Sequence, residues 1–143
     1  NPLEDLRADK TVDLVISANM LSQLPIGPES WLDKSPARAR SLPDDFLSRL
    51  VGWHLDDLRA WDTQVCLLTD IVMVERERSG AITDTLDLMR GHRLPEPDAA
   101  WQWTVAPFGE IARDLEYVHQ VQGYADFHAA MSRCQNVSPR HAA

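Results

Sequence analysis

The chain has 143 residues, of which 44% are hydrophobic and 25% are charged, as is typical of a globular domain. Its net charge of −8 disfavours nucleic acid as a partner, because phosphate backbones are repelled. The longest apolar runs, residues 12–16 and 65–68, are too short to cross a membrane, and the first residues do not resemble a secretory signal. These features predict a cytoplasmic protein of one domain, or part of one, with no membrane partner.

The cysteines and short motifs exclude several classes of site. Cys66 lies in an apolar run and Cys134 in a polar one, and neither has a second ligand at metal-binding spacing. Cys66 is therefore expected to be an inert buried thiol in a reducing compartment. No HxH or HExxH motif is present, so no metal site is predicted. The sequence also lacks a GxSxG motif and a P-loop, which argues against simple hydrolase and NTPase activities.

The most informative segment is an apolar run that ends in small and polar residues. The residues from Val12 to Ser17 predict a parallel strand buried on both faces. Residues 18–24 then open a short helical turn. Open α/β sheets bind ligands at the carboxyl ends of such strands, so this strand end is the first candidate for a site.

A loop and a well-marked helix follow. Prolines and a glycine are spread over residues 25–43, which predicts mostly loop. A helix start is expected at Ser41, with a proline and acidic residues in the first turn. The apolar stripe of this helix consists of Leu47, Val51, His54, Leu58 and Trp61.

The second half of the chain predicts more strands. Residues 64–69 indicate a second buried strand, and residues 82–89 a short helix closed by Gly91. Residues 101–105 indicate a strand with one apolar face, residues 115–124 a last strand, and the chain from Ala125 onward a weakly structured tail. The fold class is therefore α/β: a right-handed parallel crossover unit followed by an antiparallel hairpin.

This order and the segment DLVISANMLSQLP (residues 13–25) resemble the C-terminal half of class I S-adenosyl-L-methionine-dependent methyltransferases. Residues 13–25, 65–70, 101–110 and 115–124 look like the fourth to seventh strands of that family and the loops beside them. The resemblance implies half of a Rossmann-like sheet, whose last strand inserts antiparallel between its neighbours. It covers residues 1–127 as a partial domain and leaves residues 128–143 as a C-terminal tail.

The family's main cofactor contacts are missing from the chain. Its six glycines form no GxGxG motif, and no acid-ended strand precedes residue 12. The chain also begins at Asn1 without an initiator Met, which suggests a trimmed or excised chain, although processing of the start would produce the same result. Alone, it is expected to be inactive. If it does begin there, the strand from Val12 to Ser17 has an open edge, which predicts a homo-oligomer through that edge.

The resemblance implies roles for the residues at the strand ends. Ser17, Ala18 and Asn19 would border the cofactor, S-adenosyl-L-methionine, and its transferable methyl group. Asn19 and Asp70 would act as catalytic residues that orient the acceptor. Alternatively, Asn19 caps the following turn and Asp70 begins a solvated charged segment. Ser22 and Gln23 are weaker candidates for substrate binding.

Three histidines compete with these candidates. His54 lies on the apolar stripe of its helix, which favours a hydrogen-bonded core histidine over a general base. His92 and His119 have no partner that the sequence identifies. The predicted function is methyl transfer to an unidentified small-molecule or protein acceptor. The alternative is a non-catalytic α/β binding or assembly module that retains half of the fold.

Overall fold

A computed structural model describes residues 3–35, 37 and 41–135 of the chain. The fold is mixed α/β, with an open sheet of mostly antiparallel strands. The elements are α1 (Glu4–Ala8), β1 (Leu14–Ala18), α2 (Met20–Gln23), α3 (Ile26–Asp33), α5 (Phe46–Arg59), β2 (Gln64–Glu77), β3 (Ile82–Asp87), β4 (Ala99–Ala106), β5 (Leu115–Tyr124) and α6 (Phe127–Gln135).

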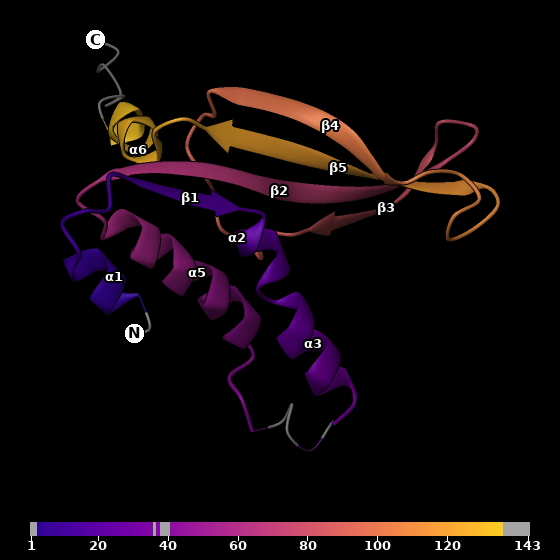
Figure 1. Cartoon of the computed structure of the whole chain (residues 1–143). Helices are drawn as coiled ribbons and strands as arrows, with labels where there is room; N and C mark the ends of the chain where they lie inside the picture. Colours follow the sequence, from indigo (N-terminus) through magenta and orange to yellow (C-terminus); the bar gives the residue numbers. More distant parts are fainter. Residues whose placement is uncertain (1–2, 36, 38–40, 136–143) are drawn as a thin grey trace, which may run out of the picture.

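The sheet is built around the long strand β2. The strand order is β1-β2-β5-β4, and β3 also pairs with β2. β1 runs parallel to β2, whereas β3 and β5 are antiparallel to β2 and β4 is antiparallel to β5. β1 pairs with residues 64–68 and β3 with residues 72–76, on the edge of β2 opposite to β5. The sheet therefore extends past the end of β1 as a wing formed by the later part of β2 with β3, β4 and β5 (Figure 1).

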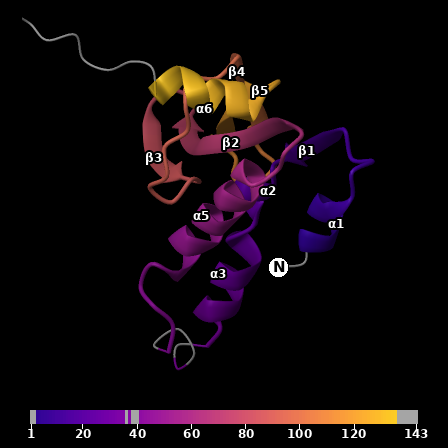
Figure 2. The same cartoon turned by 90° about the vertical axis from the view of Figure 1, so that its left-hand side faces the viewer.

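The helices α1, α2, α3 and α5 lie below the sheet in Figure 1, and the view along the sheet shows α5 and α3 extending away from it (Figure 2). α5 buries Val51, Leu55 and Leu58. These side chains share a hydrophobic core with Val65 and Leu67 of β2. The helical stripe predicted from residue spacing thus packs against alternate residues of the strand.

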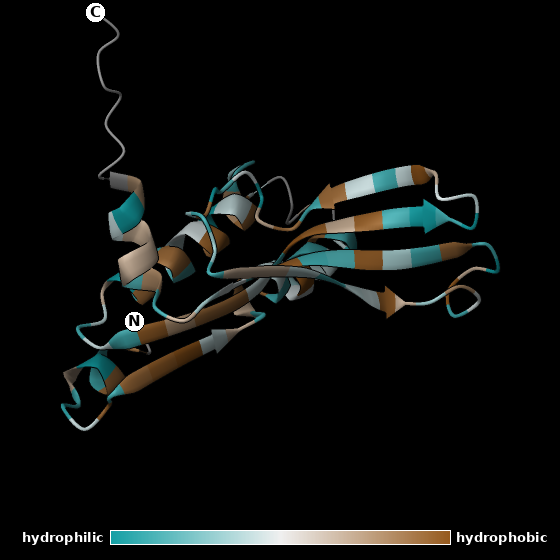
Figure 3. Cartoon of the chain, turned by 90° about the horizontal axis from the view of Figure 1, so that it is seen from above, coloured by the Kyte–Doolittle hydropathy of each residue, from teal (hydrophilic) through white to brown (hydrophobic). Residues whose placement is uncertain are grey.

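Within the described part of the chain, one face of the sheet has no layer of helices over it and carries exposed apolar side chains. The cross-strand pairs Ala18–Leu68, Leu68–Gly123 and Ala99–Gly123 define a common face of β1, β2, β5 and β4. On this face Ile16 is 63% exposed, Trp101 43% and Trp103 48%. Figure 3 views the sheet from above, the side away from α5. Sheets commonly bury large apolar side chains of this kind against another layer.

Several predictions are confirmed. β1 is parallel to β2, β5 spans residues 115–124, and β4 contains the predicted alternating tryptophans. The expected burial of the first strand on both faces is wrong, because Leu14 and Ile16 are exposed. Within the described residues only β2 flanks this strand, and one of its faces has no helical layer.

Several secondary-structure predictions are wrong. The helix expected to start at Ser41 begins at Phe46. Residues 82–87 form the strand β3, not a helix, because pairing with β2 satisfies their backbone and their threonines suit a strand. Residues 26–33, expected to be loop, form α3, in which Pro28 occupies the first turn and leaves the helical hydrogen bonds intact.

The expected tail also contains a helix. α6 begins at Phe127, which is fully buried together with Ala130. The rings of Tyr124 and Phe127 meet edge to face, 5.6 Å apart at 79°. Residues 136–143 of the expected tail lie outside the described residues. The segment after β5 thus contributes to the hydrophobic core.

Candidate functional site

The end of β1 is tied to β2 close to Asp70. The backbone N–H of Asn19 donates a hydrogen bond of 2.8 Å to the carbonyl oxygen of Leu68, two residues before Asp70. Asn19 has a positive φ of 58°, a conformation that asparagine tolerates better than most residues. It precedes α2, but its side chain makes no capping hydrogen bond. β1 thus ends beside the middle of β2, and Asp70, which was expected to end its strand, lies within β2, two residues past Leu68.

The other residues predicted near β1 point in different directions. Ser17 is buried on the α5 side, where its hydroxyl oxygen lies 3.0 Å from Nε2 of His54. Ala18 is exposed on the uncovered face. The Ser22 hydroxyl is buried and donates to the Asn19 carbonyl at 3.1 Å, so it stabilises the turn. Gln23 is exposed at the end of α2.

A groove runs along the open edge of β1. It has a volume of about 640 Å³ and almost wholly apolar walls. Its lining comes from α1, β1, α2 and α5, and includes Leu6, Val15, Met20, Leu50, Trp53 and Leu58. Ser17 and His54 contribute polar atoms to the wall of this groove. Burial lowers the pKa of His54, and the carboxylate of Asp57 partly opposes this shift. His54 is thus hydrogen-bonded on the apolar side of its helix.

Asp70 has a partner that the sequence did not reveal. Its Oδ2 lies 3.0 Å from Nδ1 of His119 on β5. The Asp70 side chain is only 5% exposed and that of His119 only 16%. Within the described chain, Oδ1 of Asp70 accepts no hydrogen bond, and Nδ1 of His119 faces the carboxylate without hydrogen-bond geometry. A buried carboxylate with one imidazole beside it is a typical arrangement for moving a proton.

Strand register produces this pair. Asp70 is paired with Val121, and a bulge at the next residue lets Met73 pair with His119. The two side chains then share the uncovered face, at neighbouring positions on β2 and β5. The alternation of Tyr117, His119 and Val121 identifies the strand from sequence, but only the register identifies the partner of His119.

Two tryptophans of β4 lie on the same face as this pair. Trp103 is the cross-strand neighbour of His119, and Trp101 that of Val121. Gly123 makes room for Trp101, because a Cβ atom there would lie 3.2 Å from the indole and 3.1 Å from Leu68. The absence of a side chain at Gly123 lets the indole lie against the strand. The site thus combines a buried Asp–His pair with exposed aromatic side chains.

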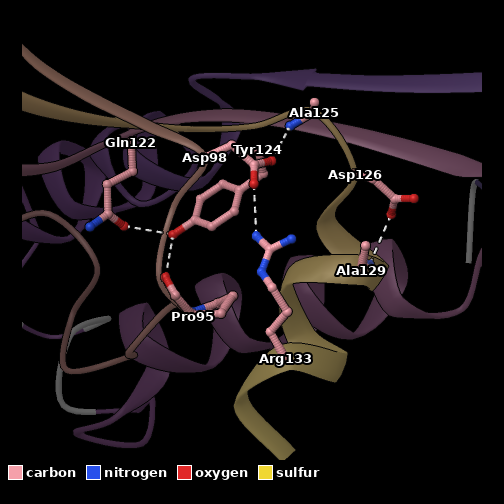
Figure 4. Close-up of polar contacts among 8 residues, drawn as sticks. All are labelled: Pro95, Asp98, Gln122, Tyr124, Ala125, Asp126, Ala129 and Arg133. Atoms are coloured by element: carbon pink, nitrogen blue, oxygen red, sulfur yellow. Dashed lines mark hydrogen bonds and ion pairs between the residues drawn. The ribbon is translucent and has the colours of Figure 1, made fainter.

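A second polar cluster serves structure (Figure 4). The Tyr124 hydroxyl lies 2.8 Å from the Pro95 carbonyl oxygen, and burial raises its pKa. Asp98 accepts a hydrogen bond from the backbone N–H of Ala125 at 2.9 Å and pairs with Arg133 of α6 at 2.7 Å. The hydrogen bond from Ala125 is the main reason that the pKa of Asp98 is lowered. These contacts hold α6 against the end of β5.

The described residues contain no cluster of three or more His, Cys, Asp or Glu side chains that could hold a metal ion. Among the helices that the structure describes, none is long and apolar enough to span a membrane. Comparisons with protein-family models, with curated proteins and with solved structures found no match.

Proposed function

We propose that the chain is the C-terminal half of a Rossmann-like methyltransferase domain. The whole domain would transfer a methyl group from S-adenosyl-L-methionine to a small-molecule or protein acceptor. The observation that carries this proposal is the strand order β1-β2-β5-β4, with a parallel pair followed by a last strand inserted antiparallel. This is the order that the resemblance implies for the family's last four strands.

The open edge of β1 supports a sheet that continues beyond this strand. In the described chain β1 pairs on one side only. Ile16 is exposed above that edge, and the apolar groove lies below it. A further strand beside β1, with helices on both faces, would cover both surfaces. Apolar surface on both sides of an edge strand is what an interior strand of a parallel sheet presents when its neighbour is removed.

The residues at the end of β1 fit only part of a cofactor site. Ala18 is exposed there and permits close approach, and the Asn19 side chain caps no helix. The Ser17 hydroxyl, by contrast, is engaged by His54 on the buried side. S-adenosyl-L-methionine would supply the methyl group, but most of its contacts would have to come from residues outside this chain. Asn19 retains its proposed role of orienting the acceptor, whereas Asp70, only 5% exposed beside His119, would act on the acceptor through His119.

The test is binding of S-adenosylhomocysteine, measured by isothermal titration calorimetry. We would compare this chain with the product of the longest natural reading frame that contains it. The proposal expects binding only by the longer protein, weakened by Asn19→Ala and unchanged by Gln102→Ala on β4. A reading frame without a glycine-rich strand–loop–helix, or a longer protein that fails to bind, would contradict it.

The open edge also favours a second candidate, a non-catalytic assembly module. An edge strand with apolar surroundings can pair with the same strand of another copy. Light scattering of the chain at increasing concentration separates the two candidates when combined with the binding test. A dimer of the natural protein that binds no S-adenosylhomocysteine would favour the assembly module.

A further inference from the structure

The strongest unassigned feature is the Asp70–His119 pair beneath the tryptophans of β4. We propose that this part of the wing binds a neutral phenol, with its ring against Trp101 and Trp103 and its hydroxyl at His119. The binding site lies wholly within this chain. Its assignment as the acceptor site rests on the proposed methyltransferase function, whereas phenol binding itself does not.

The position of the pair suits a ligand held near the end of β1. β1 ends opposite Leu68, and Asp70 follows on the same face, where the wing begins. Asn19 is hydrogen-bonded to Leu68 at this end. The wing projects from there past the tip of β1 (Figure 1). A ligand on the uncovered face of the wing would thus lie beside the strand end where open α/β sheets bind their ligands.

The pair has the chemistry of a histidine base with its orienting carboxylate. Nδ1 of His119 faces Oδ2 of Asp70 at 3.0 Å, which leaves Nε2 as the ring nitrogen available to a ligand. Among the described residues, no hydrogen bond or ion pair engages Nε2, and 16% of the side chain is exposed. Asp70, with its unpartnered Oδ1, stabilises the imidazolium that forms when Nε2 accepts a proton. Asp70 is accordingly a positioning residue.

The surrounding side chains select a neutral aromatic ligand. The two indoles offer flat apolar surface next to His119 and Val121. Farther along the same face lie Glu75 and Asp84, which are cross-strand neighbours. Tyr117 also lies there, and its hydroxyl donates to Glu75 at 3.0 Å. In the part of the chain that the structure describes, no arginine or lysine forms an ion pair with Asp70. The acidic side chains therefore favour a ligand that arrives neutral over one that arrives as an anion.

The proposed step is a proton transfer. The O–H bond of the phenol breaks, its proton bonds to Nε2 of His119, and the electron pair remains on the oxygen. The oxygen thereby becomes the nucleophile, held beside an imidazolium that Asp70 stabilises. No oxidant or reductant is involved.

The experiment titrates para-nitrophenol into this chain, because its phenolate form is coloured. Absorbance reports the phenolate fraction and tryptophan fluorescence reports binding. We expect saturable binding that raises the phenolate fraction, and binding of nitrobenzene weaker by about tenfold because it lacks the hydroxyl. Absence of saturable binding, or equal binding of the two compounds, would overturn the inference.

Variants identify the residues responsible. His119→Gln should abolish the rise in phenolate fraction while ligand binding persists, and Trp101→Ala should weaken binding about tenfold. Trp53→Leu is the matched control, because Trp53 is a similarly exposed tryptophan on α5. Circular dichroism verifies that each variant is folded. A His119→Gln variant with an unchanged phenolate fraction would refute the role of His119. If this chain does not bind para-nitrophenol but the longer protein binds S-adenosylhomocysteine, the phenol site is refuted and the methyltransferase proposal is not.

Discussion

The hydroxyl oxygen of Ser17 lies 3.0 Å from Nε2 of His54, and this contact joins the buried side of β1 to α5. Burial lowers the pKa of His54, so the neutral imidazole is its favoured form in the folded chain. The neutral ring can either accept from or donate to the serine hydroxyl. The pair therefore satisfies two polar groups at the wall of an apolar groove.

Stability is predicted to fall on mild acidification because of His54. Its folded pKa lies below the unfolded value of about 6.5, so the unfolded chain binds the proton more tightly. The contribution of His54 is complete above pH of about 6.5 and is lost as pH falls through the folded pKa. Urea unfolding of the wild type and of His54→Gln, measured across this range, isolates the effect. Parallel pH profiles for the two proteins would show that His54 is not responsible.

The C-terminal helix is predicted to be essential for the core. Phe127 is fully buried beside Tyr124, so Phe127→Ala should lower the free energy of unfolding by about 3–5 kcal/mol. Cys134→Ala alters an exposed position of the same helix, so it should change the free energy of unfolding by less than about 0.5 kcal/mol. Urea unfolding measures both. Equal effects would mean that α6 does not pack on the core.

Two glycines should respond oppositely to alanine. Gly123→Ala introduces a Cβ 3.1 Å from Leu68 and 3.2 Å from Trp101, which should destabilise the chain by about 1–3 kcal/mol and displace the indole. Gly27 lies in α3 with no neighbour within 4 Å, so Gly27→Ala should stabilise by about 0.5–1 kcal/mol. Thermal unfolding gives the signs, and tryptophan fluorescence reports the displacement. Unchanged fluorescence in Gly123→Ala would contradict the close contact with Trp101.

Proline substitutions test the direction of the backbone in β1. The backbone N–H of Asn19 points to β2. Because N–H groups alternate in direction along a strand, the N–H of Val15 also points to β2, whereas the N–H of Ile16 points to the open edge. Val15→Pro should therefore cost about 3 kcal/mol or more, and Ile16→Pro much less. Urea unfolding of the isolated chain measures the difference. A larger loss of stability in Ile16→Pro than in Val15→Pro would mean that the N–H of Ile16, and not that of Val15, is hydrogen-bonded to β2.

Sequence patterns predicted the elements whose apolar residues form a clear pattern within one short segment. The apolar runs of β1 and β2 and the stripe of α5 are each visible in one short window. The expectation that Asp70 ends its strand is wrong, because β2 continues to Glu77 by pairing with β3 and β5. β3 was missed because Ile82 and Leu86 are spaced as on one helical face, whereas pairing with β2 decides its conformation.

The Asp70–His119 pair lay beyond sequence reasoning for a different reason. It depends on which residues of β2 and β5 face each other, and a bulge after Asp70 changes that register. A single sequence does not specify the position of a bulge. The exposure of one sheet face was also not predicted, because the apolar pattern of β1 predicts burial without identifying the element that packs against each face.

We propose that β1 is an interior strand of a larger sheet, and hydrogen exchange at Ile16 tests this proposal most directly. The measurement compares the amide of Ile16 in this chain, kept dilute, with the same amide in the longest natural protein that contains it. We predict fast exchange of Ile16 in this chain and strong, concentration-independent protection in the longer protein, with Ser17 protected in both. Equally fast exchange of Ile16 in both proteins would show that β1 remains an edge strand and would contradict the claim.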